Sequence, residues 1–278
     1  MLLKYLKWYI ILKSKIKHIK KEEEKKVIYI TGDCHGDFSR FSDEKFPREK
    51  EMTKKDFVII CGDFGGVWTF EEESSQESEK LNFLNKRNFT TLFVDGNHEN
   101  FTRLYKYPEI KWNGGKIHKI RDNVLHLERG EIFNINGKKF FTFGGAKSHD
   151  IRDGILNLDE EEKIYMYRKM GAMFRIRDFS WWDLELPTKN EMENGIENLK
   201  KVNYKVDYII SHCCPTSIQS LIDFTYKKDY LTEYFQKVYE KTRFKKWFFG
   251  HYHENKNINS KFTLLYEDIN PLEYKSAF

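Results

Sequence analysis

Nine short apolar runs, separated by polar segments, are the feature that most restricts how this chain can fold. Near-continuous Val, Ile, Leu and Phe in short runs is typical of strands that are covered on both faces. So many strands do not fit one simple sheet, and the sequence therefore predicts two packed sheets. The runs are VIYIT (27–31), FVIIC (57–61), TLFVD (91–95), VLHL (124–127), EIFNI (131–135), KFFTF (139–143), DYIIS (207–211), KWFF (246–249) and FTLLY (262–266).

Helical patterns lie between several of these runs. Polar stretches with helical spacing fit between the early strands, notably around residues 79–88, which favours βα units and an α/β fold. Thr188 followed by Glu191 resembles a capping box and predicts a helix that runs to about Lys201. The Asn-Gly pair at 136–137 predicts a tight hairpin, because both central residues of that turn need positive φ.

Residues 145–187 are the least regular part of the chain, with a helical pattern only from 160 to 170. A segment of about 40 residues is near the lower limit for independent folding, so we expect an insertion over one edge of the core rather than a second domain. Arg175 and Arg177 could supply bidentate phosphate contacts, with Trp181-Trp182 beside them for stacking. A tryptophan pair is, however, more often a packing anchor.

Residues 1–26 carry most of the positive charge. They hold nine Lys and three Glu, a charge of +6, whereas the whole chain has +5, so the remainder is nearly neutral at −1. We therefore expect no strong nucleic-acid footprint on the body, residues 27–278, which we read as one domain. Apolar residues recur within 1–26 at steps of three and four, which predicts a Lys-rich amphipathic helix. That helix could touch an anionic membrane or a partner weakly, or dock on its own domain.

The four cysteines lack the paired spacing of a zinc knuckle. We recognise no secretory signal, since the longest uncharged run near the N-terminus, residues 8–12, is too short for one. We therefore expect reduced, small buried thiols in a cytoplasmic protein. The cysteines are Cys34, Cys61, Cys213 and Cys214.

Five of the apolar runs end in the same way, with residues of types that bind metals. Glycine precedes the polar residue in most of these turns, and it permits positive φ and close approach of the backbone. Ligand sites collect outside the carboxyl ends of strands in sheets with helical crossovers, so five such ends predict one shared site. In chain order the polar residues are Asp33, His35, Asp63, Asn97, His98, His212, His251 and His253.

Apart from His98, these donors are two Asp, one Asn and four His. A single divalent ion in a catalytic site usually takes about three protein ligands, so two ions bridged by one carboxylate fit the set better. Imidazole mixed with carboxylate suits Mn, Fe or Zn rather than Ca or Mg, and Mn is the ion that we expect. Each histidine alone is more often a hydrogen-bonded core or surface residue, but that interpretation does not explain five strand ends of the same kind.

The strand-end residues form five blocks. They are Asp33-x-His35, Gly62-Asp63, Gly96-Asn97-His98-Glu99, His212 and Gly250-His251-x-His253. In order and spacing these blocks resemble the calcineurin-like metallophosphoesterase superfamily over roughly residues 27–266. The resemblance is closest to uncharacterised bacterial and phage members with a similar tryptophan-pair segment. It implies a two-sheet β-sandwich flanked by helices, with four layers in the order α/β/β/α.

The resemblance also implies a role for each residue of the site. Asp33, His35 and His253 would hold the first metal. Asn97, His212 and His251 would hold the second, and Asp63 would bridge the two. His98 would remain unligated and act as the general acid, because adjacent side chains of an extended segment point apart and Asn97 faces the metal.

The activity that the resemblance implies is hydrolysis of a phosphate monoester or diester by a hydroxide held between two metal ions. Phosphoprotein phosphatases carry an arginine-bearing VDRG segment after the second block, whereas this chain has GDFGGVW at 62–68, which disfavours a protein Ser/Thr phosphatase. We expect a small phosphate ester or nucleotide-like substrate. The alternatives are a nuclease acting on single-stranded or small nucleic acid, and a catalytically silent metal-binding interaction module.

Overall fold

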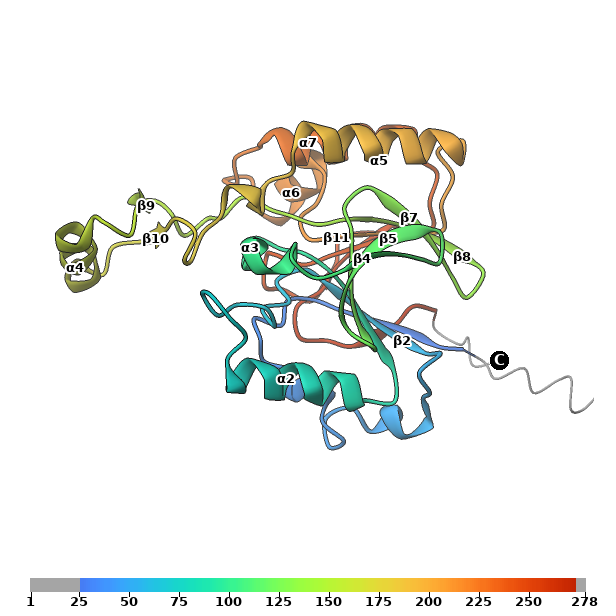
Figure 1. Ribbon diagram of the computed structural model, residues 1–278. Coiled ribbons are helices and arrows are strands. Elements are labelled where there is room, and N and C mark those ends of the chain that lie inside the picture. Colours follow the sequence, from blue (N-terminus) through green and yellow to red (C-terminus); the bar gives the residue numbers. More distant parts are fainter. Residues whose placement is uncertain (1–25, 274–278) are drawn as a thin grey trace, which may run out of the picture.

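The computed structural model describes residues 26–273, which form two large sheets and one small one (Figure 1). The first large sheet contains β1 (Ile28–Thr31), β2 (Phe57–Cys61), β3 (Thr90–Val94), β4 (Glu109–Trp112), β5 (Gly115–Arg121), β6 (Val124–Leu127) and β15 (Asn270–Pro271). Their order is β15-β1-β2-β3-β6-β5-β4, and β1, β2, β3 and β6 are parallel neighbours. The helix predicted for residues 1–26 lies, but for Lys26, outside the described residues.

The second large sheet contains β7 (Glu131–Ile135), β8 (Lys138–Phe143), β11 (Tyr208–Ser211), β12 (Lys246–Phe249), β13 (Lys256–Asn257) and β14 (Phe262–Leu264). Their order is β13-β14-β12-β11-β8-β7, and β8, β11, β12 and β14 are parallel neighbours. Every apolar run that was predicted to be a strand is one. The Asn-Gly pair forms the β7–β8 hairpin turn with φ of 53° and 76°, which confirms the predicted hairpin.

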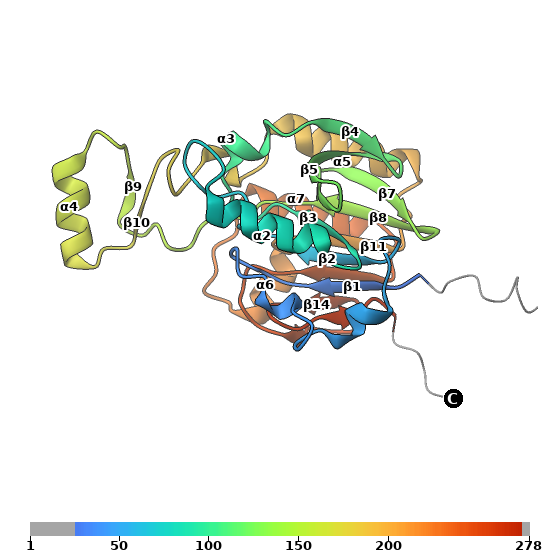
Figure 2. The ribbon, with the colours of Figure 1, turned by 60° about the horizontal axis from the view of Figure 1, so that its bottom comes forward.

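Helices cover the outer face of each large sheet (Figures 1 and 2). The first sheet carries α2 (Ser75–Lys86), and the second carries α5 (Lys189–Lys201), α6 (Thr216–Ile222) and α7 (Tyr230–Lys241). The short helices are α3 (Phe101–Leu104) and the 3₁₀ turns η1 (Ser39–Phe41), η2 (Pro47–Glu51) and η3 (Asp183–Glu185). The predicted four-layer α/β/β/α sandwich is confirmed. So is the capping box at α5, where Thr188 and Glu191 exchange side-chain-to-backbone hydrogen bonds.

The continuous apolar runs follow from burial of both faces of each sheet. In β2, Phe57, Ile59 and Cys61 point into the core between the two sheets. Val58 and Ile60, which alternate with them, point into the core beneath α2. A strand covered on both faces has no position left for a polar side chain, so polar residues gather where the strand ends.

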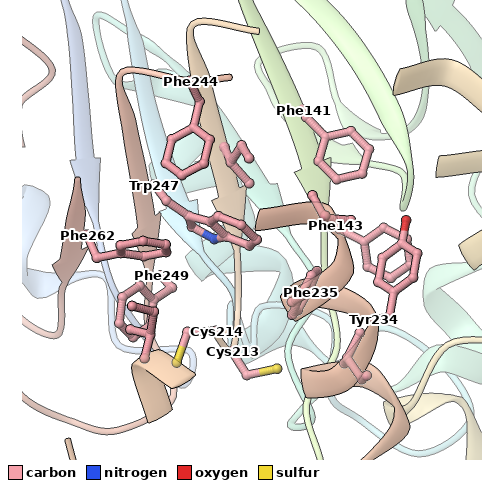
Figure 3. Close-up of a cluster of buried hydrophobic side chains, with 14 of the residues drawn as sticks. Phe141, Phe143, Cys213, Cys214, Tyr234, Phe235, Phe244, Trp247, Phe249 and Phe262 are labelled. Carbon is pink, nitrogen blue, oxygen red and sulfur yellow. The ribbon is translucent and has the colours of Figure 1, made fainter. Parts of the chain in front are cut away.

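Trp247 lies at the centre of the core between the second sheet and its helices (Figure 3). Its side chain is fully buried, its ring stacks on Phe262 with centroids 5.4 Å apart, and Phe235 and Phe244 meet it edge-on. The indole Nε1 donates a hydrogen bond of 2.6 Å to Ser211 Oγ. Both the apolar body and the polar tip of the residue are therefore satisfied.

We expect Trp247→Ala to lower the free energy of unfolding by about 3–5 kcal/mol, because it leaves a large cavity and removes the donor to Ser211. Chemical unfolding monitored by circular dichroism measures this loss. Phe224→Ala serves as the control, since Phe224 is 88% exposed and its loss should change stability by less than about 0.5 kcal/mol. Equal effects of the two substitutions would contradict this description of the core.

The structure differs from the sequence-based expectation at two elements. A hairpin of β4 and β5 extends the first sheet, and its turn contains Asn113 and Gly114 with φ of 48° and 103°. The same Asn-Gly signal therefore marks a hairpin whose strands are too polar to show as apolar runs. Helix α2 begins at Ser75, four residues before the expected start at 79, because Ser74 accepts a hydrogen bond from the Glu77 amide and caps it.

Residues 151–177, called the arm below, extend away from the two-sheet body in both views (Figures 1 and 2). The arm contains β9 (Gly154–Leu156), α4 (Glu161–Met170) and β10 (Phe174–Ile176), and β9 and β10 form a parallel two-stranded sheet. The expected helical pattern at 160–170 is thus a helix. We expected this segment to lie over one edge of the core, and the arm does not. Its apolar residues pack on each other rather than on the body.

The four cysteines are free and buried, as predicted. Burial raises the pKa of Cys34 to about 12, so this thiol stays protonated at neutral pH. None of the helices in the described part of the chain has the length and apolar character needed to cross a bilayer. The cytoplasmic location stays a prediction.

Candidate metal centre

The predicted site residues meet at one edge that both large sheets share. Asp33, Asp63 and Asn97 follow β1, β2 and β3, which are parallel neighbours in the first sheet. His212 follows β11, and His251 and His253 follow β12, its parallel neighbour in the second sheet. Parallel strands end at the same edge, so their carboxyl ends bring residues far apart in the sequence together.

One cluster contains Asp33, His35, Asp63 and His253, whose ligand atoms all lie within 4.8 Å of one another. His253 Nε2 lies 3.2 Å from Asp33 Oδ2 and 3.2 Å from His35 Nε2. His35 Nε2 lies 3.8 Å from Asp63 Oδ2. Two imidazoles and two carboxylates thus point at one small volume.

A second group adjoins the first through Asp63. His212 Nε2 lies 3.2 Å from Asp63 Oδ1 and 3.2 Å from Asn97 Oδ1. The ring of His251 lies 5.0 Å from that of His212, measured between centroids. Asp63 therefore contacts both groups, as the bridging role implied by the family resemblance requires.

His251 and His253 lie on different sides of this site. His253 is beside Asp33 and His35, whereas His251 is beside His212. Both residues have positive φ, of 71° and 52°, so the segment is not extended and its alternate side chains need not point the same way. His35 and Asp63 also have positive φ, and such backbone strain in non-glycine residues concentrates at functional sites.

The glycines before the polar residues let the backbone approach the carboxylates closely. A Cβ on Gly96 would lie 2.0 Å from Asp63 Oδ1, and a Cβ on Gly250 would lie 2.1 Å from Asp33 Oδ1. Any side chain at either position would push a carboxylate out of the cluster. Because Gly250 has no side chain, the backbone can approach Asp33, and the amide of His251 donates a hydrogen bond to Asp33 Oδ1 at 3.0 Å.

Burial and the two carboxylates determine the pKa values of this site. Burial alone would lower the pKa of His212, but the Asp63 and Asp33 carboxylates raise it to about 9. Burial alone would raise the pKa of Asp63. The charge of His212 outweighs this effect and holds the Asp63 pKa well below the usual range. Burial lowers the pKa of His251 well below its ordinary value, so this imidazole is neutral, the form that binds metals.

The residues of the site fit divalent metal ions. Asp33 and Asp63 are fully buried, and the ion pairs that the described residues give these carboxylates are all with histidines. With no Lys or Arg partner, the two carboxylates depend on protonated histidine, notably His212, for positive charge, and bound divalent ions would supply that charge in its place. Imidazole and carboxylate are donors that first-row divalent ions bind well.

His98 lies beside this site, and among the described residues its ring forms no hydrogen bond or ion pair with a carboxylate. Its backbone amide donates to Asp63 Oδ1 at 2.8 Å, and its ring lies 5.4 Å from that of His35 and 6.3 Å from that of Trp68. Burial lowers its pKa; the nearby Asp63 carboxylate opposes this effect without overcoming it, and the charge of Arg175 lowers the pKa further. Neutral imidazole is therefore its main form near pH 7, and the minor imidazolium form is a stronger acid than that of an ordinary histidine.

Asp95 supports the segment that carries Asn97, a role that no motif in the sequence indicates. Its carboxylate accepts hydrogen bonds from Arg129 Nε at 2.8 Å and from His126 Nε2 at 3.0 Å, all three side chains being buried. On the other side, Asn97 Nδ2 donates to Ser148 Oγ at 3.2 Å. These residues are spread over separate elements, so only the tertiary structure reveals them.

His118 extends the Asp95 network, because its Nδ1 lies 3.0 Å from His126 Nδ1. Burial lowers the pKa of His118 to about 4, against about 6.5 in an unfolded chain. Between these pH values the unfolded state binds a proton that the folded state does not, so stability falls as the pH falls from 6.5 to 4. We expect His118→Gln to reduce the slope of the unfolding free energy against pH by an amount equivalent to at most one bound proton.

Unfolding by urea at a series of pH values measures the slope for each protein. Glu128, whose carboxylate lies 3.8 Å from His118 Nε2, has a pKa raised by burial to about 7 and titrates with the opposite sign. Both proteins retain it, so the comparison of slopes isolates His118 from any general loss of stability. Equal slopes for the parent and His118→Gln between pH 4 and 6.5 would show that the fold does not hold His118 neutral.

The insertion residues singled out in the sequence have partners in the structure. Arg175 Nε donates to Asp150 Oδ2 at 2.9 Å, and Arg177 pairs with Asp183. Trp181 and Trp182 are buried, and Trp182 Nε1 donates to Thr102 at 3.0 Å. The tryptophan pair is therefore a packing anchor rather than a stacking platform.

Two packed sheets with an Asp/His cluster at their shared edge are the arrangement that the resemblance to metallophosphoesterases implies. The family model for calcineurin-like phosphoesterase matches residues 26–255, so the chain belongs to that family. Among curated proteins, none matches the chain. The family and the cluster together indicate a site for divalent metal ions and a function in phosphoester hydrolysis.

Proposed function

We propose that this protein is an active metal-dependent phosphoesterase that hydrolyses monoesters or diesters of small or nucleotide-like molecules, with Mn²⁺ as its metal. The observation that carries the proposal is the cluster of Asp33, His35, Asp63 and His253, whose ligand atoms lie within 4.8 Å. The cluster combines two buried carboxylates with two exposed imidazoles, and among the described residues no Lys or Arg forms an ion pair with these carboxylates. It is what a metal-dependent hydrolase needs.

Two ions would be held by the two groups that share Asp63. Asp33, His35 and His253 would hold one, and Asn97, His212 and His251 would hold the other. When bound, such ions supply positive charge for the phosphoryl oxygens and lower the pKa of water so that it can attack phosphorus.

His98 would donate the proton that the leaving oxygen needs. Its ring is partly exposed and stands between His35 and Trp68, next to the cluster but not within it. The hydrogen bond from its backbone amide to Asp63 fixes its position relative to the bridging carboxylate. The imidazolium form, a minor fraction near pH 7 because the pKa is lowered, would give its N–H proton to the departing oxygen as the P–O bond breaks and become neutral imidazole.

The surroundings of His98 support a substrate with a flat group. Trp68 is partly exposed beside it and could stack on a ring, a role that the buried Trp181 and Trp182 cannot fill. Arg175 lies close enough for its charge to affect the pKa of His98. We propose that Arg175 exchanges Asp150 for a phosphate oxygen of the substrate.

The proposal is tested with Mn²⁺-loaded protein and two chromogenic esters, p-nitrophenyl phosphate and bis-p-nitrophenyl phosphate. We expect turnover of at least one ester well above that of Asp63→Asn protein prepared in the same way. A preference between the two esters distinguishes a monoesterase from a diesterase. Turnover no higher than in Asp63→Asn would instead assign the chain to the silent interaction modules.

A further inference from the structure

The outer face of α4, at the tip of the arm, exposes large apolar side chains. Tyr165 is 60% exposed, Met166 is 54% exposed and Met170 is 76% exposed. The arm's own core consists of three buried residues, Leu156, Ile164 and Ile176. One helix on a two-stranded sheet with so small a core is marginally stable alone, so cover on its outer face would stabilise it.

Four exposed residues of α4 form a stripe along one face of the helix. Their spacing of three, four and seven residues places them in line. The stripe has an acid near one end, a base near the other and apolar side chains in the middle. It consists of Glu162, Tyr165, Met166 and Lys169, and Ile164 lies on the opposite, buried face.

We propose that this stripe is a self-association surface, on which a second copy of the chain docks with its α4 antiparallel. The midpoint of the stripe falls between Tyr165 and Met166, and Glu162 and Lys169 are equally far from it along the helix. A two-fold axis through the midpoint therefore sets Glu162 opposite the partner subunit's Lys169, and Lys169 opposite the partner subunit's Glu162. A parallel arrangement would place like charges together instead.

The charges of α4 are available for such a contact. The first turn carries Glu161 and Glu162, and the last turn carries Arg168 and Lys169. Within the part of the chain that the structure describes, none of these four has an ion-pair partner, and Lys169 Nζ lies over the Tyr165 ring at 4.6 Å. In the antiparallel pair, the acidic first turn of each helix would face the basic last turn of the other.

The projection of the arm leaves room for a second body. α4 lies at the far end of the arm from the two sheets in both views (Figures 1 and 2). A pair of ten-residue helices buries less than the roughly 1,200 Å² of a standard interface. We therefore expect a weak dimer that forms as the concentration rises. This association is independent of the proposed phosphoesterase activity.

Sedimentation of the full chain over a concentration series tests the proposal. We expect the mass to rise from 33.6 kDa to twice that value, and Met166→Glu to hold it at the monomer. Glu162→Lys and Lys169→Glu should each be monomeric, because like charges then face each other. Mixing these two charge variants should restore the dimer, since every contact across the two-fold axis is again between opposite charges. Leu221→Glu, at a 62% exposed apolar residue of the body, is the control and should dimerise like the parent.

Cysteine substitution tests the antiparallel direction. The native cysteines are buried, so an added cysteine on α4 is the exposed thiol among the described residues. Met166→Cys should form a disulfide-linked dimer on mild oxidation. Met170→Cys should not, because the antiparallel pair separates residue 170 from its mate by about 13 Å along the helix axis.

Four results would overturn the proposal. They are a monomer at every concentration, a dimer that Met166→Glu does not weaken, failure of the mixed charge variants to associate, and disulfide formation at residue 170 as readily as at residue 166. A monomer that sediments with anionic lipid vesicles through Tyr165 and Met166 would assign the stripe to a membrane surface instead.

Discussion

Replacing His98 with alanine is expected to lower kcat by about 10²–10⁴-fold and to leave the bound metal unchanged. The side chain lies outside the carboxylate cluster, and its one hydrogen bond to Asp63 comes from the backbone amide, which alanine retains. Metal content measured by atomic emission and turnover measured on the same preparation separate the two effects.

The size of the loss should depend on the leaving group. A general acid matters more when the departing oxygen is more basic, so we expect a greater fold loss with phenyl phosphate than with p-nitrophenyl phosphate. The comparison needs no second variant, because both esters present the same phosphoryl group. Loss of metal together with activity, or equal losses on both esters, would contradict the role of His98 as the acid.

Gly96→Ala is expected to lose both metal and activity, in contrast to His98→Ala. The added methyl would lie 2.0 Å from Asp63 Oδ1 and 2.3 Å from the Asp63 backbone nitrogen. Since that nitrogen belongs to the turn after β2, the clash has to move the bridging carboxylate or the turn. We expect a stability cost of about 1–3 kcal/mol, as for other overpacked sites, with metal affinity and turnover falling together.

Gly137→Ala is the matched control for this prediction. Gly137 lies in the β7–β8 turn with φ of 76°, and an added methyl there meets nothing within 4 Å. This substitution should lower the free energy of unfolding by only ~1 kcal/mol, because alanine is strained in the left-handed conformation, and it should not affect the metal centre. Retention of metal and activity by Gly96→Ala would show that the close approach at Asp63 is not needed.

The strands and the strand-end residues could be predicted because burial on both faces imposes a simple pattern. A covered strand such as β2 excludes polar side chains, and so Asp63 stands out where the strand ends. The hairpin of β4 and β5 escaped prediction because β4 lies at the edge of its sheet and is mostly exposed, so its sequence alternates without an apolar run. The Asn113-Gly114 pair was the available signal.

The supports of the site could not be predicted, since they depend on contacts between distant elements. Arg129 reaches Asp95 from a turn 34 positions away, and Ser148 reaches Asn97 across 51 positions. The direction of the arm is a similar case. Its sequence shows helix α4, but only packing of Ile164 on Leu156 and Ile176 reveals that the segment folds on itself away from the body.

The separation of His251 and His253 also required the structure. Two residues apart on an extended chain, they would face the same way. Because both residues have positive φ, the segment bends and the two side chains join different groups. The family resemblance implied that separation without its geometric cause. Strain of this kind is tolerated where the surrounding hydrogen bonds hold it, here including the one from the His251 amide to Asp33.

We propose that one edge of the sandwich binds two divalent ions that share Asp63. Equilibrium binding of Mn²⁺, counted per chain for the parent and for Asp63→Asn, tests this proposal. We predict two ions per chain for the parent, and fewer and weaker ones for Asp63→Asn, since both groups lose their shared carboxylate. Binding of no Mn²⁺ by the parent, or identical binding by both proteins, would contradict a two-ion site that shares Asp63.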